Sequence, residues 1–379
     1  MLVAHLSLTD FRNYESAEVD FAAGANLFVG SNGQGKTNLV ESLGFLSTLG
    51  SHRVSTDHAM IRQGCDSAIV RAKLEHGERR VLAEVQINRT GANRAQINRS
   101  AIKTRELPRY FSSVLFAPED LALVRGDPSG RRKFLDELLV LRMPRLAGTL
   151  ADYERVLKQR NSLLKSARAS GAAAGSLATL EIWNERLVEI GSEIIEARGQ
   201  LVAELRPAMS AAYIAIAGDD HQATVLSQLS IVEDADVSEG ESGPMNAVVA
   251  RELFRASLER VRRAEIDRAI TLVGPHRDDL VLGLNGMGAR GYASHGESWS
   301  FALALKLASA EVLRRESTTG DPVLVLDDVF AELDQARRAR LAGAVSGFGQ
   351  VLITAAVLED VPAELTSHTV HVSKGRIVE

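Results

Sequence analysis

Two short segments at opposite ends of this 379-residue chain constrain its fold more than any other feature. Residues 30–37 read Gly-Ser-Asn-Gly-Gln-Gly-Lys-Thr, and residues 322–328 read Pro-Val-Leu-Val-Leu-Asp-Asp. The first is a glycine-rich loop with a lysine, and the second is an apolar strand that ends in two carboxylates. Because such a loop and such a strand normally share one sheet, we expect a sheet that begins near one terminus and is completed 291 positions later (327 − 36), near the other.

The first segment matches the pattern Gly-x-x-x-x-Gly-Lys-Thr of a phosphate-binding P-loop. It follows the apolar run 27–29 and precedes residues 38–46, whose apolar side chains have helical spacing. In that setting, backbone N–H groups and the helix N-terminus attract phosphate oxygens. We expect Lys36 to reach the β- and γ-phosphates of ATP and Thr37 to bind Mg²⁺. The expected nucleotide-binding residues of the loop are Gly30, Ser31, Asn32, Gly33, Gln34, Gly35, Lys36 and Thr37.

The second segment is a continuous apolar run over residues 323–326, as expected of a strand that is covered on both faces. Asp327 falls at its carboxyl end, where α/β sheets place ligand groups. We expect Asp327 to hold Mg²⁺ together with Thr37, and Asp328 to orient or deprotonate the attacking water. Lys36, Asp327 and Asp328 are therefore the candidate catalytic residues. The alternative is a buried strand that ends in a solvated acidic turn.

Composition limits the classes of protein that this chain can represent. It is 45% hydrophobic and 25% charged, which is typical of a globular protein. Its one cysteine, Cys65, excludes an internal disulfide and suits a reducing compartment. The first twenty residues carry five charges, and no apolar run approaches the eighteen or so residues of a membrane span. We therefore expect a cytoplasmic protein that does not interact with membranes.

The middle of the chain has a helical pattern. Positions spaced alternately four and three residues apart form two heptad seams, Leu146, Leu150, Tyr153, Leu157, Arg160, Leu164 and Trp183, Leu187, Ile190, Ile194, Ala197, Leu201. Residues 166–176 between them are rich in glycine, alanine and serine. This predicts an antiparallel helix hairpin with seams of about 20 residues, hence an arm of about 30 Å. Two ordinary bundle helices are the alternative. Residues 218–245 are expected to be a surface loop, 248–268 a helix and 272–282 a return to strands.

A third motif precedes the helical pattern of residues 301–308. Residues 294–297 read Ser-His-Gly-Glu, which resembles the ABC-type signature, and residues 331–334 match the D-loop of that class. In such proteins the signature helix N-terminus binds the γ-phosphate of ATP held by the partner subunit. The resemblance makes Ser294, Gly296 and Glu297 nucleotide-binding residues, and Ser294 and Asp334 dimer-interface residues. Plain helix capping is the alternative explanation.

Taken together, the chain resembles the RecF family of DNA replication and repair proteins over nearly all of its length. The motifs that carry the resemblance are residues 10–14, 30–41, 116–121, 131–136, 159–165, 274–279 and 327–334. The resemblance implies an α/β fold, with an ABC-type ATPase head built from both chain ends and an inserted helical arm. The implied parts are residues 1–125, residues 126–268 with the hairpin, and residues 269–379 with the signature, acidic strand and D-loop.

The resemblance also implies a function. It predicts an ATP-dependent homodimer that binds DNA at gaps and at junctions of single-stranded and duplex DNA, and that assists RecR and RecO in loading RecA. Three departures from the ABC pattern bear on the site. Trp299 follows the signature and is expected to pack at the dimer interface. Thr354 stands where a histidine is common, and is expected to contact the γ-phosphate or water. Asp328 replaces a longer glutamate, which predicts slow turnover suited to a switch.

A basic segment is the candidate DNA-binding region. Ten basic and four acidic residues lie between Arg71 and Arg109, a net charge of +6 on a chain of −5. Local positive charge attracts phosphates, and few aromatic residues interleave here, which favours contacts to the backbone of duplex DNA. The candidates are Arg71, Lys73, Arg89, Arg94 and Arg99. A solvated hairpin surface is the alternative.

Other ATPase classes fit less well. The 258 positions between Lys36 and Ser294 are too many for an ABC transporter subunit, whereas the arm is too short for a full SMC protein. A small-molecule kinase needs neither signature nor D-loop. The remaining alternative is a nucleotide-gated scaffold in which hydrolysis is incidental.

Overall fold

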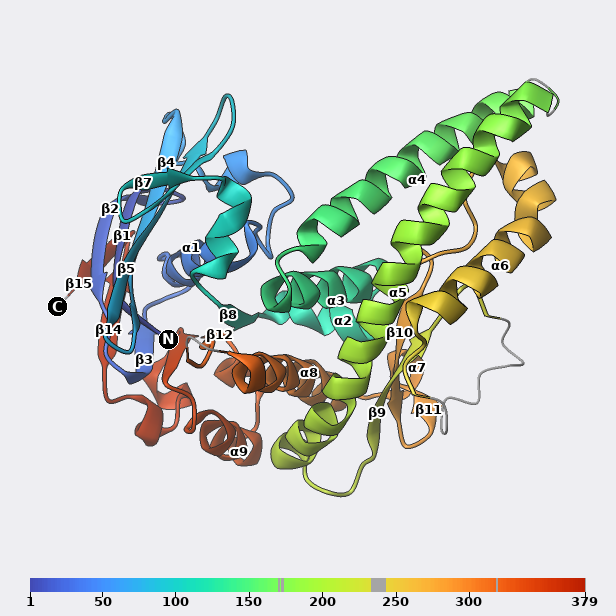
Figure 1. The fold of residues 1–379 in the computed structure, drawn as a ribbon. Coiled ribbons are helices and arrows are strands. Elements are labelled where there is room, and N and C mark those ends of the chain that lie inside the picture. The colour runs from blue at the N-terminus through green and yellow to red at the C-terminus, as the bar shows by residue number, and fades with distance from the viewer. Residues whose placement is uncertain (170, 172–173, 233–242, 318–319, 379) are drawn as a thin grey trace. The chain divides into compact units, whose positions relative to one another are not determined.

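The computed structural model describes residues 1–169, 171, 174–232, 243–317 and 320–378. Figure 1 labels the helices and strands of the chain, which forms two compact units. Unit 1 comprises Met1–Arg125, Ala208–Gln222 and Tyr292–Glu379, and unit 2 comprises Gly126–Pro207 and Ala223–Gly291. This division differs from the sequence-based one in two places: residues 208–222 belong to unit 1, and unit 2 continues beyond residue 268. Residues 269–291 stay in unit 2 because their strand pairs with one formed by residues 223–228.

A mostly parallel sheet lies in unit 1 and joins the two ends of the chain, which confirms the predicted α/β class. Its order is β15-β14-β3-β13-β12-β8, and only β15 is antiparallel to its neighbour. The strands are β3 (Gly24–Val29), β8 (Ser113–Phe116), β12 (Val323–Asp327), β13 (Gln350–Ala355), β14 (Thr369–Ser373) and β15 (Arg376–Val378). The N-terminal strand β3 thus sits between two strands from the C-terminus. Every residue of β12 and β13 is buried, which for β12 confirms the prediction from its continuous apolar run.

The helices of unit 1 cover and flank this sheet. They are α1 (Lys36–Thr48), α2 (Leu121–Arg125), α8 (His295–Glu316) and α9 (Gln335–Val345), together with the C-terminal end of α5 (Ala174–Ala217). Helix α1 contacts β8, β12 and β13, and α8 contacts β8. The expected helix over residues 301–308 is therefore part of a longer one, whose first turn contains the signature residues.

A second, antiparallel sheet of unit 1 has the order β2-β1-β4-β5-β6-β7. Its strands are β1 (Leu2–Phe11), β2 (Tyr14–Asp20), β4 (Ser67–His76), β5 (Arg79–Asn88), β6 (Arg94–Ile97) and β7 (Ser100–Ile102). Alternate residues of β4 are buried, namely Ala68, Val70, Ala72 and Leu74. Because strand side chains alternate between faces, the intervening Arg71 and Lys73 lie on the opposite face.

Unit 2 is built on a helical bundle (Figure 1). It contains α3 (Pro128–Arg142), α4 (Leu146–Ala169), most of α5, α6 (Ala247–Arg268) and α7 (Ala289–Tyr292), with the small sheet β11-β10-β9. The strands are β9 (Ala223–Gln228), β10 (Asp279–Leu284) and β11 (Met287–Gly288). Helices α4 and α5 run antiparallel. Two hydrogen bonds show this direction, since Arg160 bonds Asn184 (2.8 Å) whereas Arg145, immediately before α4, bonds Glu193 farther along α5 (2.5 Å).

The hairpin is not a free-standing pair of helices. Phe254 and Leu258 of α6 share one apolar core with Tyr153 of α4 and Leu187 of α5. The two seams therefore belong to a three-helix bundle. This is closer to the alternative of two ordinary bundle helices than to a separate hairpin arm. Helix α5 also extends well beyond its seam and has 44 residues, hence about 66 Å at 1.5 Å per residue.

One seam position of α4 holds a buried ion pair. Arg160 is 1% exposed and donates to Glu265 of α6 at 2.6 Å, and the Glu265 side chain is fully buried. Arg160 also donates to the hydroxyl of Thr271 at 2.8 Å, and Glu265 accepts the N–H of Leu272 at 2.7 Å. This polar cluster joins α4, α6 and the segment that follows α6.

Two sequence-based assignments in unit 2 were wrong in detail. Part of the expected loop 218–245 forms strand β9, whose partner β10 lies about fifty residues later; residues 233–242 lie outside the described chain. The expected strand over 272–282 begins only at Asp279. Residues 274–277 instead form a turn, in which the N–H of Arg277 donates to the carbonyl oxygen of Gly274 at 2.8 Å. Gly274 has φ +120°, and a Cβ there would also meet the Phe254 ring at 2.5 Å, so this position requires glycine.

No helix within the described ranges is long and apolar enough to cross a membrane.

Candidate nucleotide-binding site

The P-loop connects β3 to α1 in unit 1, in the strand–loop–helix setting that its sequence predicted. Gly33 and Gly35 have φ of +80° and +120°, which other residues rarely adopt. A Cβ at Gly30 would collide with the carbonyl oxygen of Val372 in β14. Gly30 is therefore required by close packing against the neighbouring strand as well as by its place in the motif.

Lys36 is almost fully buried at the start of α1. Its ammonium donates to the carbonyl oxygens of Gly30 (2.6 Å) and Ser31 (3.3 Å), so the side chain lies over its own loop. Burial lowers the pKa of Lys36, and the carboxylates of Asp328 and Asp327 oppose that shift. A lysine held this way, with glycine N–H groups around it, fits the phosphates of a nucleotide.

The two distant segments meet at Asp327. The hydroxyls of Thr37 and Thr354 both donate to its Oδ1, at 3.1 and 2.6 Å. Asp327 and Thr354 are paired residues at the ends of the parallel strands β12 and β13. The structure therefore brings Thr37 and Asp327, the two expected Mg²⁺ ligands, together. Oxygen ligands of this kind, one or two from the protein, suit Mg²⁺ bound to a phosphate.

Burial sets the electrostatics of this junction. Asp327 is 2% exposed, and burial raises its pKa to about 6, although the hydrogen bonds from Thr354 and Thr37 act in the opposite direction. A bound divalent cation would favour the ionised carboxylate. The hydroxyl of Thr354 donates to Asp327 and accepts the N–H of Asp328 at 3.0 Å, so it orients both acidic residues, and its contact with the γ-phosphate or water stays a prediction.

Asp328 has an unusual backbone and an unsatisfied side chain. Its φ is +57°, and its N–H donates to the carbonyl oxygen (3.3 Å) and hydroxyl (3.0 Å) of Thr354. Within the described part of the chain, its buried Oδ1 has no hydrogen-bond partner. Buried polar atoms without partners are rare and concentrate at functional sites. This carboxylate is thus free to bind a water molecule.

The signature residues form a capped helix start. Ser294 is the N-cap of α8: its Oγ accepts the N–H of Glu297 at 3.3 Å, and its N–H donates to Glu297 Oε2 at 2.7 Å. These bonds from Ser294 are the main reason why the pKa of Glu297 is lowered. A Cβ at Gly296 would meet Arg337 Nη1 at 2.7 Å, and Asp334 caps α9 by accepting the N–H of Arg337.

The structure therefore gathers Ser294, Gly296, Glu297 and Asp334, which are the predicted signature and interface residues. No hydrogen bond joins this group to the P-loop among the residues that the structure describes. Both the capping explanation and a role toward a second subunit remain compatible with this arrangement.

The expectation for Trp299 was wrong. It is 3% exposed, its ring packs edge-on against Phe116 (5.6 Å between centroids), and its Nε1–H donates to His295 Nε2 at 3.0 Å. This tryptophan packs inside its own subunit and orients His295 within the signature turn.

The five candidate DNA-binding residues do not form one patch. Arg71 pairs with Glu84 across the strands, and exposed Lys73 follows on the same face. Arg89 and Arg94 flank the turn after β5, whereas Arg99 lies in the β6–β7 turn at the other end. Leu82, which bonds Asn98, lies six positions before Asn88 in β5, hence about 20 Å from it.

Residues from two other segments also contact the P-loop. Asn13, which belongs to the motif at residues 10–14, hydrogen-bonds Gln34, and so do Lys374 and Gly375. The sequence does not indicate these contacts: no local pattern marks Lys374 and Gly375, and only the strand order β14-β3 places the C-terminal turn beside the loop.

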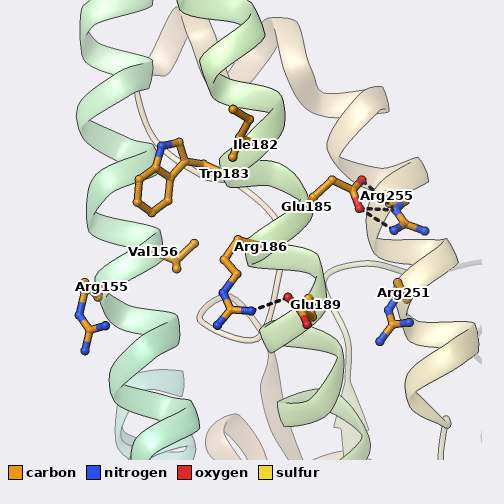
Figure 2. Close-up of a pocket in the computed structure, with 9 residues that line it drawn as sticks. All are labelled: Arg155, Val156, Ile182, Trp183, Glu185, Arg186, Glu189, Arg251 and Arg255. Carbon is orange, nitrogen blue, oxygen red and sulfur yellow. Dashed lines mark hydrogen bonds and ion pairs between the residues drawn. The ribbon is translucent and has the colours of Figure 1, made fainter.

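A separate hollow of about 680 Å³ lies in unit 2 between α4, α5 and α6 (Figure 2). Arg186 pairs with Glu189, and Arg255 pairs with Glu185, both at 2.6 Å, so most of its charges are balanced within its own wall. Arg155 and Arg251 also line it and add positive charge to its wall. The P-loop remains the candidate nucleotide site, because the expected Mg²⁺ ligands Thr37 and Asp327 meet beside it.

Comparison with known proteins identifies the family of the chain. The family model for the RecF/RecN/SMC N terminal domain matches residues 2–374. The protein named DNA replication and repair protein RecF from Clavibacter sepedonicus is 65% identical over 391 aligned residues, which cover 100% of this chain and 95% of that relative. The protein of the same name from Leifsonia xyli subsp. xyli is 64% identical over 383 residues and is covered completely, as is this chain.

Solved structures agree with this result. One is described as the recombination mediator protein RecF-ATPrS in the RecFOR pathway; it is 29% identical with a TM-score of 0.87, over 99% of this chain and 97% of that one. An Smc head bound to the C-winged helix domain of ScpA shares the fold, at 15% identity and a TM-score of 0.56, over 100% of this chain and 97% of that one. The chain therefore belongs to the RecF family and has the fold of an ABC-type ATPase head.

Proposed function

We propose that this protein binds and hydrolyses ATP and uses that cycle to control its binding to DNA in replication and repair. The proposal rests on one arrangement: the hydroxyls of Thr37 and Thr354 both donate to Asp327, beside a P-loop whose Lys36 donates to the carbonyl oxygen of Gly30. Mg²⁺-ATP, when bound, would supply the phosphoanhydride bond to be cleaved. Lys36 and the loop N–H groups would hold the phosphates, Thr37 and Asp327 the metal, and Asp328 would orient or deprotonate water.

The active form is proposed to be an ATP-dependent homodimer. Ser294 and the start of α8 from a second copy would bind the γ-phosphate, with Asp334 at the interface. The capping box supports this role because it fixes the helix N-terminus, where partial positive charge attracts anions.

The relatives named DNA replication and repair protein RecF, and the structure described within the RecFOR pathway, support a role in DNA replication and repair together with RecR and RecO. We propose that this role is to assist the loading of RecA at DNA gaps and junctions. We propose slow, DNA-stimulated hydrolysis that releases the protein. The alternative is a nucleotide-gated scaffold in which hydrolysis is incidental.

An Asp328→Asn variant separates these two functions. It should bind ATP as the wild type does but hydrolyse it at least about a hundredfold more slowly, since a preorganised catalytic group is lost. If hydrolysis drives release, the ATP-bound variant should also leave gapped DNA more slowly in a competitor-chase experiment. Unchanged DNA release, despite lost hydrolysis, would favour the scaffold.

The basic residues can be tested by comparing the two ends of β5. Exposed Arg89, Arg94 and Lys103 gather at one end, because Ile102 pairs with Ala95. Reversing these three charges should reduce the slope of log affinity against log salt by about 2 to 3. Reversing Arg79, Arg80 and Arg99 tests the other end in the same way, and the variant with the larger loss of slope identifies the end that contacts DNA. Equal slopes for wild type and the first variant would contradict DNA binding at Arg89 and Arg94.

A further inference from the structure

Two turns that are distant from the P-loop in sequence contact it at Gln34. One is the β1–β2 turn, which contains Asn13, and the other is the β14–β15 turn at Lys374 and Gly375. The second turn reaches the loop because β14 is parallel to β3, so both strands end at the same edge of the sheet. Close packing of Gly30 against Val372 fixes the spacing of these strands.

Three hydrogen bonds connect the turns to Gln34 of the loop, and a fourth connects Asn13 to helix α1. The N–H of Lys374 donates to Gln34 Oε1 (2.6 Å), and that of Gly375 to the Gln34 carbonyl oxygen (2.9 Å). Asn13 Nδ2 donates to the same carbonyl oxygen at 3.1 Å, while its Oδ1 accepts from Asn38 Nδ2 of α1 at 2.7 Å. The side-chain amide of Asn13 thus bridges the loop and the first turn of α1.

The two turns also touch each other tightly. A Cβ at Gly375 would lie 2.6 Å from the Asn13 carbonyl oxygen, and a Cβ at Gly35 would lie 2.8 Å from Asn13 Nδ2. Neither glycine can therefore gain a side chain without displacing Asn13. The loop conformation consequently depends on the tip of the C-terminal hairpin.

We propose that the turn at Lys374 and Gly375 is a positioning element of the nucleotide site, which, together with Asn13, holds the P-loop in its phosphate-binding shape. Phosphate binding by loop N–H groups requires them to converge before the ligand arrives, so loss of the turn weakens binding without removing any phosphate contact. This inference rests on the proposed nucleotide binding at the P-loop.

A pair of glycine variants tests it. Gly375→Ala adds a Cβ at φ +68° and displaces Asn13, whereas Gly77→Ala adds one at φ +61° in the β4–β5 turn with nothing within 4 Å. Both carry the same backbone strain, so only the first should raise the dissociation constant for a fluorescent ADP analogue, by about tenfold or 1.4 kcal/mol. The melting temperature without nucleotide should fall further for Gly375→Ala, because only that variant also displaces Asn13, and both variants should remain folded at the temperature of the binding assay.

Asn13→Ala removes the amide bridge without adding atoms, and should also raise the dissociation constant severalfold. Wild-type protein that fails to bind the analogue would contradict the nucleotide site itself. Wild-type binding with Gly375→Ala and Asn13→Ala both within twofold of wild type would overturn the positioning role alone.

Discussion

Replacing Lys36 by methionine is expected to lower the rate of ATP hydrolysis by at least about a hundredfold, the loss usually seen when one preorganised donor is removed from a developing charge. The ammonium is already buried over Gly30 and Ser31, so a neutral side chain also removes a bond that shapes the nucleotide-free loop. Phosphate release under single-turnover conditions measures the effect.

Lys133→Met provides the control, since Lys133 is an exposed lysine on α3 whose partner is Glu137 at 3.6 Å. Its hydrolysis rate should equal that of wild type. Hydrolysis by Lys36→Met at more than a tenth of the wild-type rate would mean that the phosphates are bound elsewhere.

Replacing Glu265 by alanine is expected to lower the free energy of unfolding of unit 2 by about 3 to 5 kcal/mol, because Arg160 would remain buried without its carboxylate. The N–H of Leu272 would also lose its acceptor. Urea unfolding followed by Trp183 fluorescence in a Trp299→Phe background reports unit 2, since these are the only two tryptophans of the chain.

Glu185→Ala is the matched control. Glu185 also pairs with an arginine, Arg255 at 2.6 Å, but both side chains are about half exposed, so its loss should cost no more than about 1 kcal/mol. The double change Arg160→Met and Glu265→Leu should recover much of the stability, because no unpaired buried charge remains. Similar losses for Glu265→Ala and Glu185→Ala would contradict this account of the core.

The nucleotide site was largely predictable because its motifs carry their own local context. A glycine-rich loop between a strand and a helix specifies where Lys36 and Thr37 lie. An apolar strand that ends in Asp327 specifies the edge of the sheet to which that residue belongs. The meeting of these segments across 291 positions then follows from sheet topology.

The features that were missed depend on distant partners. Strand β9 is short and becomes a strand only by pairing with β10. The heptad seam of α4 gave no sign that α6 would pack against it, although Arg160 at a seam position was a sign of a polar partner in the core. The position of Trp299 after the signature suggested an interface. Its actual partner, Phe116, lies far away in the sequence, so no local pattern predicted this packing.

The central claim is that one chain carries half of a shared ATP site, and its mass in solution tests this most directly. Light scattering on the Asp328→Asn protein should give a monomer of 40.9 kDa without nucleotide or with ADP, and about 81.8 kDa (2 × 40.9) with ATP and Mg²⁺. Ser294→Arg added to that background should bind ATP but stay monomeric. A protein that binds ATP and remains at 40.9 kDa under every condition, with or without gapped DNA, would contradict the shared site.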